Sequence, residues 1–289
     1  MYREYYGLVK LPFEMTPDPS FLYLGEAHRE GLATLVYAMQ SGKGFVVLTG
    51  EVGTGKTTLL HALMHQLDPA TAAAYLFNPK LEPLDFFRMF FEELGIGDSC
   101  HTKADYLLAL NRFLIQKHEK GEPTVLIVDE AQNLSPELLE EIRMLSNLET
   151  STSKLIQIML VGQPELNELL GRTELRQLRQ RISLRHQLRP FDAKETAEYI
   201  EERLARAGYT GGRLFKRSAT REVYKHTGGI PRLINTLCDS ALVLGYSQSR
   251  SSLDAAQVRE AAMDLGLSAD TEGRNEGHRN RRRWFGFRA

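Results

Sequence analysis

The most specific chemical pattern in the chain spans residues 50–57. Their sequence, GEVGTGKT, matches the phosphate-binding pattern GxxxxGK(S/T) in full. Glycines let backbone N–H groups turn inward around phosphate oxygens, and the N-terminus of the helix that follows adds positive potential. We therefore predict a nucleotide site, with Lys56 at the β- and γ-phosphates and the Thr57 hydroxyl as a ligand of Mg²⁺. The residues expected to contact the nucleotide are Gly50, Glu51, Val52, Gly53, Thr54, Gly55, Lys56, Thr57 and Thr58.

Two acidic residues, Asp129 and Glu130, follow the apolar run Val125-Leu-Ile-Val128. The run predicts a buried strand, so both carboxylates would stand at its carboxyl end. We expect Asp129 to hold Mg²⁺ together with Thr57, and Glu130 to orient and polarise an attacking water. An acidic pair in this position favours hydrolysis over nucleotide binding alone, and a solvated acidic turn is the alternative.

Gln163 follows another apolar run, residues 155–161. If this run is the neighbouring strand, Gln163 lies beside the end of the strand that carries Asp129 and Glu130. It could then contact the γ-phosphate or the lytic water. The alternative, which the sequence leaves open, is a turn residue placed before Pro164.

Arginine is concentrated in residues 172–189, which contain Arg172, Arg176, Arg179, Arg181, Arg185 and Arg189. One interpretation is the basic, solvated face of a helix. A second is that one arginine projects into the nucleotide site of a neighbouring subunit and neutralises charge in the transition state. A third is contact with nucleic-acid phosphates. For the arginine that acts in trans we choose Arg181, with Arg179 as the second choice.

Arg232 directly follows Pro231, which begins a predicted helix after Gly228-Gly-Ile230. A positive charge at a helix N-terminus opposes the helix dipole. That misfit favours a functional role, and contact with nucleotide phosphates would suit it. A surface arginine is the alternative.

The elements between residues 26 and 190 predict an α/β fold. Strands are predicted at residues 44–49, 72–77, 125–128 and 155–161, and helices at residues 26–40, 58–67, 84–95, 104–119 and from Ser135 onward. Nearly continuous apolar strands that alternate with helices indicate a parallel sheet covered on both faces. We therefore predict a nucleotide-binding domain over residues 26–190.

The rest of the chain differs from this domain. Four helical patterns, at residues 194–208, 216–226, 231–246 and 254–264, predict a small helical domain over residues 191–268. Residues 1–25 are rich in proline and aromatic side chains and predict a rigid, non-helical N-terminal strap. Residues 269–289 predict a disordered basic tail.

Composition excludes several classes of protein. The 289 residues are 42% hydrophobic and 25% charged, which is typical of soluble globular proteins. The two cysteines form no CxxC pattern, so a disulfide framework or zinc site is not expected. The histidines are scattered along the sequence, which indicates surface or packing residues and not a metal site. We find no secretory signal and no apolar run that could span a bilayer.

The formal net charge of −1 hides an asymmetry. Residues 272–289 hold a net charge of +4, which leaves −5 for the remainder. An acidic body argues against a protein that coats nucleic acid over its whole surface. On composition alone the tail could be a DNA-binding arm.

Six segments resemble the AAA+ ATPase superfamily and, within it, the general secretion pathway protein A (ExeA) family of bacterial secretion ATPases. They are FEMTPDP at 13–19, TGEVGTGKT at 49–57, DEAQNL at 129–134, SNLET at 146–150, GQPEL at 162–166 and GGIPRLIN at 228–235. The resemblance covers roughly residues 1–266. Related ATPases accompany exosortase or exopolysaccharide systems, or act in transposition (the TniB type).

The resemblance implies a P-loop NTPase of the AAA+ type, with a parallel sheet sandwiched by helices and a small helical lid. Such a protein binds and hydrolyses ATP with Mg²⁺ and assembles into a homo-oligomer. By the same resemblance Gln163 is the first sensor, Arg181 is the arginine finger in trans, and Arg232 is the second sensor that closes the lid. The strap would lie near the adenine, with Phe13 or Thr16 lining it.

One departure from the family affects the expected function. Its secretion members typically continue into a transmembrane helix and a periplasmic peptidoglycan-binding domain, whereas this sequence ends at Ala289. We therefore expect no direct action on the cell wall. The tail, in which arginines flank Trp284, Phe285 and Phe287, would instead suit peripheral contact with an anionic membrane.

We thus expect a cytoplasmic ATPase, peripheral at the inner membrane if its tail binds lipid, that performs assembly or transport work for a secretion or envelope apparatus. Secretion or envelope proteins would be its partners. One alternative is a DNA-associated ATPase of transposition, with residues 172–189 and the tail as its DNA contacts. Another is a nucleotide switch that hydrolyses slowly.

Overall fold

The computed structural model describes residues 2–14, 21–77, 81–97, 100–151 and 153–267. Contacts between residues divide the chain into two units. The described residues of 26–189 form one, called here the α/β unit, and residues 2–14 and 21–25 group with residues 190–267 in the other, called the helical unit. The sequence predicts a separate N-terminal strap, but these first residues belong to the helical unit. The predicted basic tail lies outside the described residues.

Within the described part of the chain, the α/β unit contains one sheet of five strands in the order β2-β3-β4-β1-β5. All its strand pairs are parallel. The strands are β1 (Phe45–Gly50), β2 (Ala72–Leu76), β3 (Thr124–Val128), β4 (Gln157–Gly162) and β5 (Ile182–Leu188). The predicted parallel sheet is therefore confirmed, and the first four strands lie at the apolar runs that predict them.

The fifth strand is missing from the sequence prediction. β5 lies in the segment 172–189, for whose arginines the sequence suggests a helix face, a finger in trans or nucleic-acid contacts but no strand, and it pairs with β1 at the edge of the sheet. Its side chains alternate between half-buried and exposed until Leu188. An edge strand needs no continuous apolar run, since one of its faces and its outer side can meet water.

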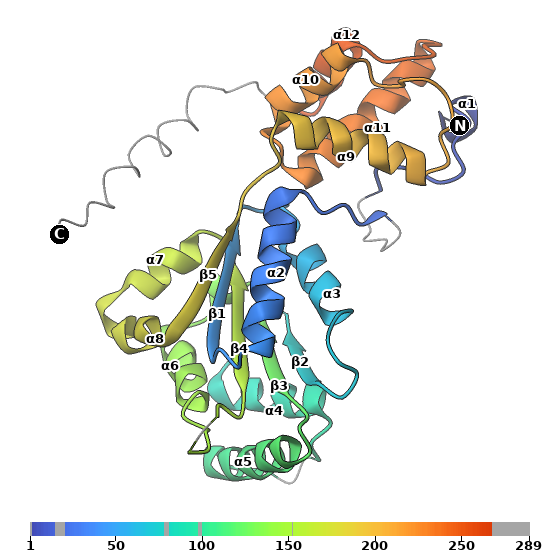
Figure 1. The fold of residues 1–289 in the computed structure, drawn as a ribbon. Helices are drawn as coiled ribbons and strands as arrows, with labels where there is room; N and C mark the ends of the chain where they lie inside the picture. Colours follow the sequence, from blue (N-terminus) through green and yellow to red (C-terminus); the bar gives the residue numbers. More distant parts are fainter. Residues whose placement is uncertain (1, 15–20, 78–80, 98–99, 152, 268–289) are drawn as a thin grey trace, which may run out of the picture. The chain divides into compact units, whose positions relative to one another are not determined.

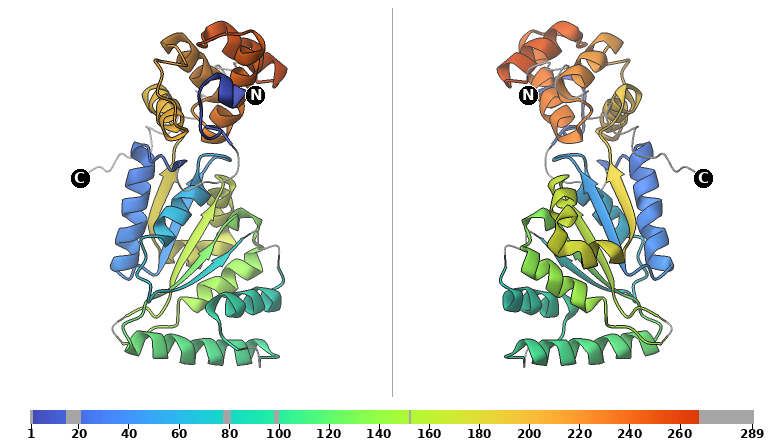
Figure 2. Two further views of the ribbon diagram at one scale, coloured as in Figure 1. Left: turned by 90° about the vertical axis from the view of Figure 1, so that its right-hand side faces the viewer. Right: turned by 90° about the vertical axis from the view of Figure 1, so that its left-hand side faces the viewer.

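Helices cover both faces of this sheet, with α2 and α3 on one face and α4 and α6 on the other (Figure 1 and Figure 2). The helices of the unit are α2 (Glu26–Gln40), α3 (Lys56–Met64), α4 (Pro83–Leu94), α5 (Lys103–Glu119), α6 (Pro136–Leu145), α7 (Glu165–Gly171) and α8 (Arg176–Arg181). Helix α6 begins as the sequence predicts, because Ser135 Oγ accepts a hydrogen bond from the Leu138 N–H and Pro136 occupies the first turn.

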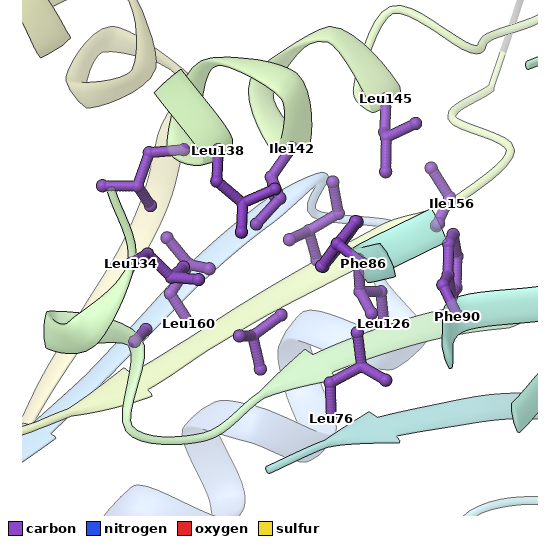
Figure 3. Close-up of a cluster of buried hydrophobic side chains, with 14 of the residues drawn as sticks. Leu76, Phe86, Phe90, Leu126, Leu134, Leu138, Ile142, Leu145, Ile156 and Leu160 are labelled. Carbon is purple, nitrogen blue, oxygen red and sulfur yellow. The ribbon is translucent and has the colours of Figure 1, made fainter. Parts of the chain in front are cut away.

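The main core lies between the sheet and helices α4 and α6 (Figure 3). Phe86 and Phe90 of α4 and Ile142 of α6 are fully buried there. They pack over Leu126 and Leu160, which point from β3 and β4 into the same layer. Burial of each such side chain is worth about 1.5–3 kcal/mol. This core fixes the ends of β3 and β4, and with them the residues that follow those strands.

The helical unit contains α9 (Ala193–Arg206), α10 (Arg217–Thr227), α11 (Pro231–Ser247) and α12 (Ala255–Asp264), close to their predicted positions. Capping boxes at Asp192 and Asp254 start α9 and α12. The Gly228-Gly229 pair ends α10 with two left-handed residues. A Cβ on Gly229 would lie 1.8 Å from the Phe191 carbonyl oxygen, so only glycine fits at position 229, just before α11 begins.

The N-terminal residues differ from their prediction in one respect, because Tyr2–Tyr5 form the short helix α1. The phenol of Tyr2 donates to Asp239 of α11, a tertiary contact that the local sequence does not encode. Phe13 is 1% exposed and its ring centroid lies 6.1 Å from that of Phe215, inside the core of the helical unit. Its ring is thus packed against protein, and Thr16 lies outside the described residues.

Candidate active site

The phosphate-binding pattern forms the turn between β1 and α3. Gly53 and Gly55 have φ angles of 78° and 96°, in the left-handed region that glycine adopts without strain. Gly55 is the N-cap of α3, so the loop runs directly into a helix N-terminus. The Lys56 side chain is buried, and its Nζ donates to the carbonyl oxygens of Gly50 (2.8 Å) and Glu51 (3.1 Å). The amine therefore lies inside the curve of its own loop.

A buried histidine supports this loop from α2. The Nε2 atom of His28 lies 2.8 Å from the carbonyl oxygen of Thr54. A Cβ on Gly55 would come within 3.0 Å of the same nitrogen, so the glycine leaves room for the imidazole. The histidine is a packing residue, as the sequence suggests for histidines here, but its place against the phosphate loop is not predicted.

Asp129 and Thr57, the two predicted metal ligands, are in contact. The Thr57 hydroxyl donates to Oδ2 of Asp129 over 3.1 Å, and Asp129 is fully buried. Its Oδ1 accepts the backbone N–H of Glu130 at 2.9 Å. A hydroxyl and a carboxylate placed together form an oxygen donor set of the kind that Mg²⁺ prefers. These residues therefore fit the ion that the sequence implies.

Tyr75 is a member of this group that sequence reasoning missed. Its phenol donates to Oδ2 of Asp129 over 2.8 Å, so that oxygen accepts from both Tyr75 and Thr57. Burial, followed by the negative charge of Asp129, raises the pKa of the Tyr75 phenol well above its ordinary value. The hydroxyl thus stays protonated and remains a donor to the carboxylate throughout the physiological pH range.

Glu130 lies beside Gln163, as the sequence interpretation of both residues requires. Gln163 Nε2 donates to Oε2 of Glu130 over 3.1 Å. A second amide, Gln132 Nε2, donates to the same oxygen at 2.6 Å, although sequence reasoning gave Gln132 no role. Glu130 itself has a φ angle of 53°, a conformation that is uncommon for a residue with a Cβ. Strained backbone of this kind is typical of functional sites.

The predicted arginine finger contacts its own subunit. Arg181 is the last residue of α8, and its guanidinium donates to the Ser146 hydroxyl at 2.9 Å. Arg179, the second choice, is exposed and donates to the Gly171 carbonyl at 3.1 Å. Burial and the nearby charge of Arg179 lower the pKa of Arg185, so two guanidinium groups lie near each other here.

Arg232 is the second residue of α11 and is exposed. It belongs to the helical unit, whereas the phosphate loop, Asp129 and Glu130 belong to the α/β unit. The residues brought together within the α/β unit are thus the loop, Thr57, Asp129, Glu130 and Gln163. The predicted contact of Arg232 with nucleotide phosphates stays a prediction.

Comparisons with known proteins agree with this arrangement. Residues 39–170 match the family model of an AAA domain. The chain is 40% identical over 266 residues to general secretion pathway protein A of Aeromonas hydrophila, a match that covers 92% of this chain and 48% of that protein. The chain therefore spans about half the length of this curated relative.

Solved structures of low sequence identity share the fold. Cdc6p from Pyrobaculum aerophilum is 16% identical, with a TM-score of 0.66 over 86% of this chain and 71% of that one. Drosophila ORC bound to DNA is 17% identical, with a TM-score of 0.69 over 93% of this chain and 66% of that one. Among the described residues, no helix combines the length and apolar character needed to cross a bilayer. With its AAA domain and parallel sheet, the chain belongs to the AAA+ ATPases and, among them, to the family of general secretion pathway protein A.

Proposed function

We propose that this chain binds ATP with Mg²⁺ and hydrolyses it to ADP and inorganic phosphate. The observation that carries the proposal is the hydrogen bond from Thr57 to Asp129. It joins the end of the phosphate loop to the end of β3, where Glu130 follows. The loop that would bind phosphate and the Glu130 carboxylate, which can accept a proton, therefore belong to one site.

Binding would begin at the loop. The backbone N–H groups of residues 51–55 and the N-terminus of α3 would receive the phosphate oxygens. Lys56 now donates to two loop carbonyls, and its amine would exchange these for the β- and γ-phosphates. Thr57 and Asp129 would hold Mg²⁺, and the ion when bound would neutralise charge on the phosphate oxygens.

Hydrolysis would then depend on Glu130 and Gln163. A water oxygen attacks the γ-phosphorus, the bond from that phosphorus to the bridging oxygen of ADP breaks, and the water proton passes to the Glu130 carboxylate. Gln163 already touches Glu130, so its amide can orient the same carboxylate and the water. General-base help of this kind is worth about 10²–10⁴-fold in rate.

The cellular role that hydrolysis would serve is inferred from the similar protein and not from the geometry of the site. The name of general secretion pathway protein A supports a role in a secretion or envelope apparatus. We include in the proposal a homo-oligomer in which Arg181 of one copy reaches the site of another, and a helical unit that responds to nucleotide through Arg232.

Removal of the loop lysine tests the proposal. Wild-type protein should bind a fluorescent ATP analogue and release phosphate in a Mg²⁺-dependent reaction, whereas Lys56→Ala should lose both properties. Lys120→Ala, which changes an exposed lysine at the end of α5, is the matched control and should behave as wild type. Phosphate release by Lys56→Ala at the wild-type rate would contradict the proposal.

A further inference from the structure

A closed ring of hydrogen bonds joins Glu130, Gln132 and Gln163. Gln132 Nε2 donates to Glu130 Oε2 at 2.6 Å, and Gln163 Nε2 donates to the same oxygen at 3.1 Å. The ring closes through Gln132 Oε1, which accepts the backbone N–H of Gln163 at 3.0 Å. The Gln132 amide thus contacts both the Glu130 carboxylate and the backbone N–H of Gln163.

The fold makes room for this amide. Gln132 lies in the single turn Ala131–Asn133, which is anchored by the fully buried Ala131 and by the hydrogen bond from the Asn133 N–H to the Glu130 carbonyl. On the opposite side, a Cβ on Gly162 would lie 2.5 Å from Gln132 Oε1. Gly162 is the last residue of β4, so the absence of a side chain there leaves the space that the amide occupies.

A carboxylate at the end of a glutamate side chain has broad rotational freedom when nothing holds it. Two N–H donors that converge on Oε2 restrict that freedom and select one orientation of the group. Orientation matters for catalysis, because a misplacement of about 1 Å can cost on the order of 100-fold in rate.

We propose that Gln132 is a positioning residue that holds the Glu130 carboxylate and the Gln163 backbone in the arrangement used for attack on the γ-phosphate. The inference rests on the proposed ATPase function and assigns to Gln132 a part in the same site. Gln132 acts through Glu130 and Gln163, so it should affect turnover and leave nucleotide affinity unchanged.

Gln132→Met tests this role, since methionine has nearly the length of glutamine but no amide. We expect kcat to fall at least about tenfold while the KM for ATP stays within about twofold of wild type. Gln116→Met, at an exposed glutamine of α5, is the matched control. A kcat within twofold of wild type would overturn the proposal, and so would a raised kcat, which would mean that the contact holds Glu130 back.

Two further variants separate positioning from a general loss of structure. In a Glu130→Gln background, Gln132→Met should have little added effect on kcat, because the carboxylate that it positions is already gone. An equal loss in both backgrounds would overturn the proposal. Gly162→Ala should lower kcat through the clash with Gln132 Oε1, and the fold-loss should be much smaller in a Gln132→Ala background. The same fold-loss in both backgrounds would overturn the proposal.

Failure of the ATPase proposal would look different. A wild-type protein that binds ATP but never turns it over would contradict the proposed function. The same four proteins (wild type, Glu130→Gln, Gln132→Met and the double variant) would then test the contact by thermal unfolding. Non-additive shifts in Tm would support the ring, and additive shifts would overturn it.

Discussion

The side-chain amide of Gln163 donates a hydrogen bond to the Glu130 carboxylate over 3.1 Å. Gln163, the first residue after β4, and Glu130, the second residue after β3, thus lie in direct contact. The contact exists because β3 and β4 pair in parallel, with Val128 opposite Leu160, so that their carboxyl ends lie at the same edge.

Gln163→Leu should lower kcat by about 10–100-fold and leave ATP affinity within about twofold of wild type. Leucine keeps most of the bulk but cannot hydrogen-bond the carboxylate or a water. Phosphate release and binding of a fluorescent ATP analogue are compared with those of the wild type, and Gln180→Leu, at an exposed glutamine of α8, is the matched control. Loss of binding in parallel with turnover would show that Gln163 supports the loop instead.

Tyr75→Phe should destabilise the nucleotide-free protein by about 1–2 kcal/mol, because a buried carboxylate loses one of its donors. Mg²⁺ with ADP should recover part of this loss, since the bound ion would stabilise the Asp129 carboxylate in place of the lost hydrogen bond. The free energy of unfolding in urea, with and without Mg²⁺ and ADP, measures both effects. Tyr37→Phe, at an exposed tyrosine, should change neither. An unchanged free energy for Tyr75→Phe would contradict the importance of the contact.

Mixing two inactive variants tests the action of Arg181 in trans. Arg181→Ala keeps Glu130 but lacks the finger, and Glu130→Gln keeps the finger but lacks the base. Mixed oligomers would contain complete sites, so the mixture should hydrolyse ATP faster than either variant alone. Activity equal to the average of the two would contradict a role in trans. Arg88→Ala, which changes an exposed arginine of α4, controls for loss of surface charge.

Alkaline pH should weaken the helical unit through Tyr6. Burial raises the pKa of Tyr6 to about 12, and its hydroxyl has no hydrogen-bond partner among the described residues. In the unfolded chain the phenol of a tyrosine has its ordinary pKa of about 10. The unfolded state therefore loses its proton first, so the stability from Tyr6 is complete below about pH 10 and is lost as pH rises through about 12.

Tyr6→Phe removes this titration. Between pH 9 and 11 its urea midpoint should fall less than that of the wild type, and at pH 8 the two should be close, since phenylalanine leaves no unpaired hydroxyl. Equal falls in both proteins would exclude Tyr6 as a source of the pH dependence.

The sequence predicts the parts of the site that depend on local spacing. The loop at residues 50–57 and the Asp129-Glu130 pair follow from residue type and order, and the structure brings Thr57 and Asp129 into contact. Tyr75 and Gln132 could not be found in this way, because their contacts depend on which residues of neighbouring strands lie opposite each other. Tyr75 reaches Asp129 because β2 and β3 pair with Leu76 opposite Val128.

The fold shows the same division. Strands β1, β3 and β4 are buried throughout, and β2, which lies at the other edge of the sheet, is apolar along its length, so all four leave apolar runs in the sequence. β5 alternates between half-buried and exposed residues and carries Arg185 and His186, so it leaves no such run. Helix α1 escapes prediction because its contact with α11 is tertiary.

Phosphate release at saturating Mg²⁺ and ATP, measured for the wild type and for Glu130→Gln, tests the proposed ATPase most directly. Bound nucleotide should be measured on the same samples, with Glu168→Gln, at an exposed carboxylate of α7, as the control. We predict that Glu130→Gln binds ATP as the wild type does and releases phosphate at least about 100-fold more slowly. Full turnover by Glu130→Gln would contradict the assignment of Glu130 as the group that activates water.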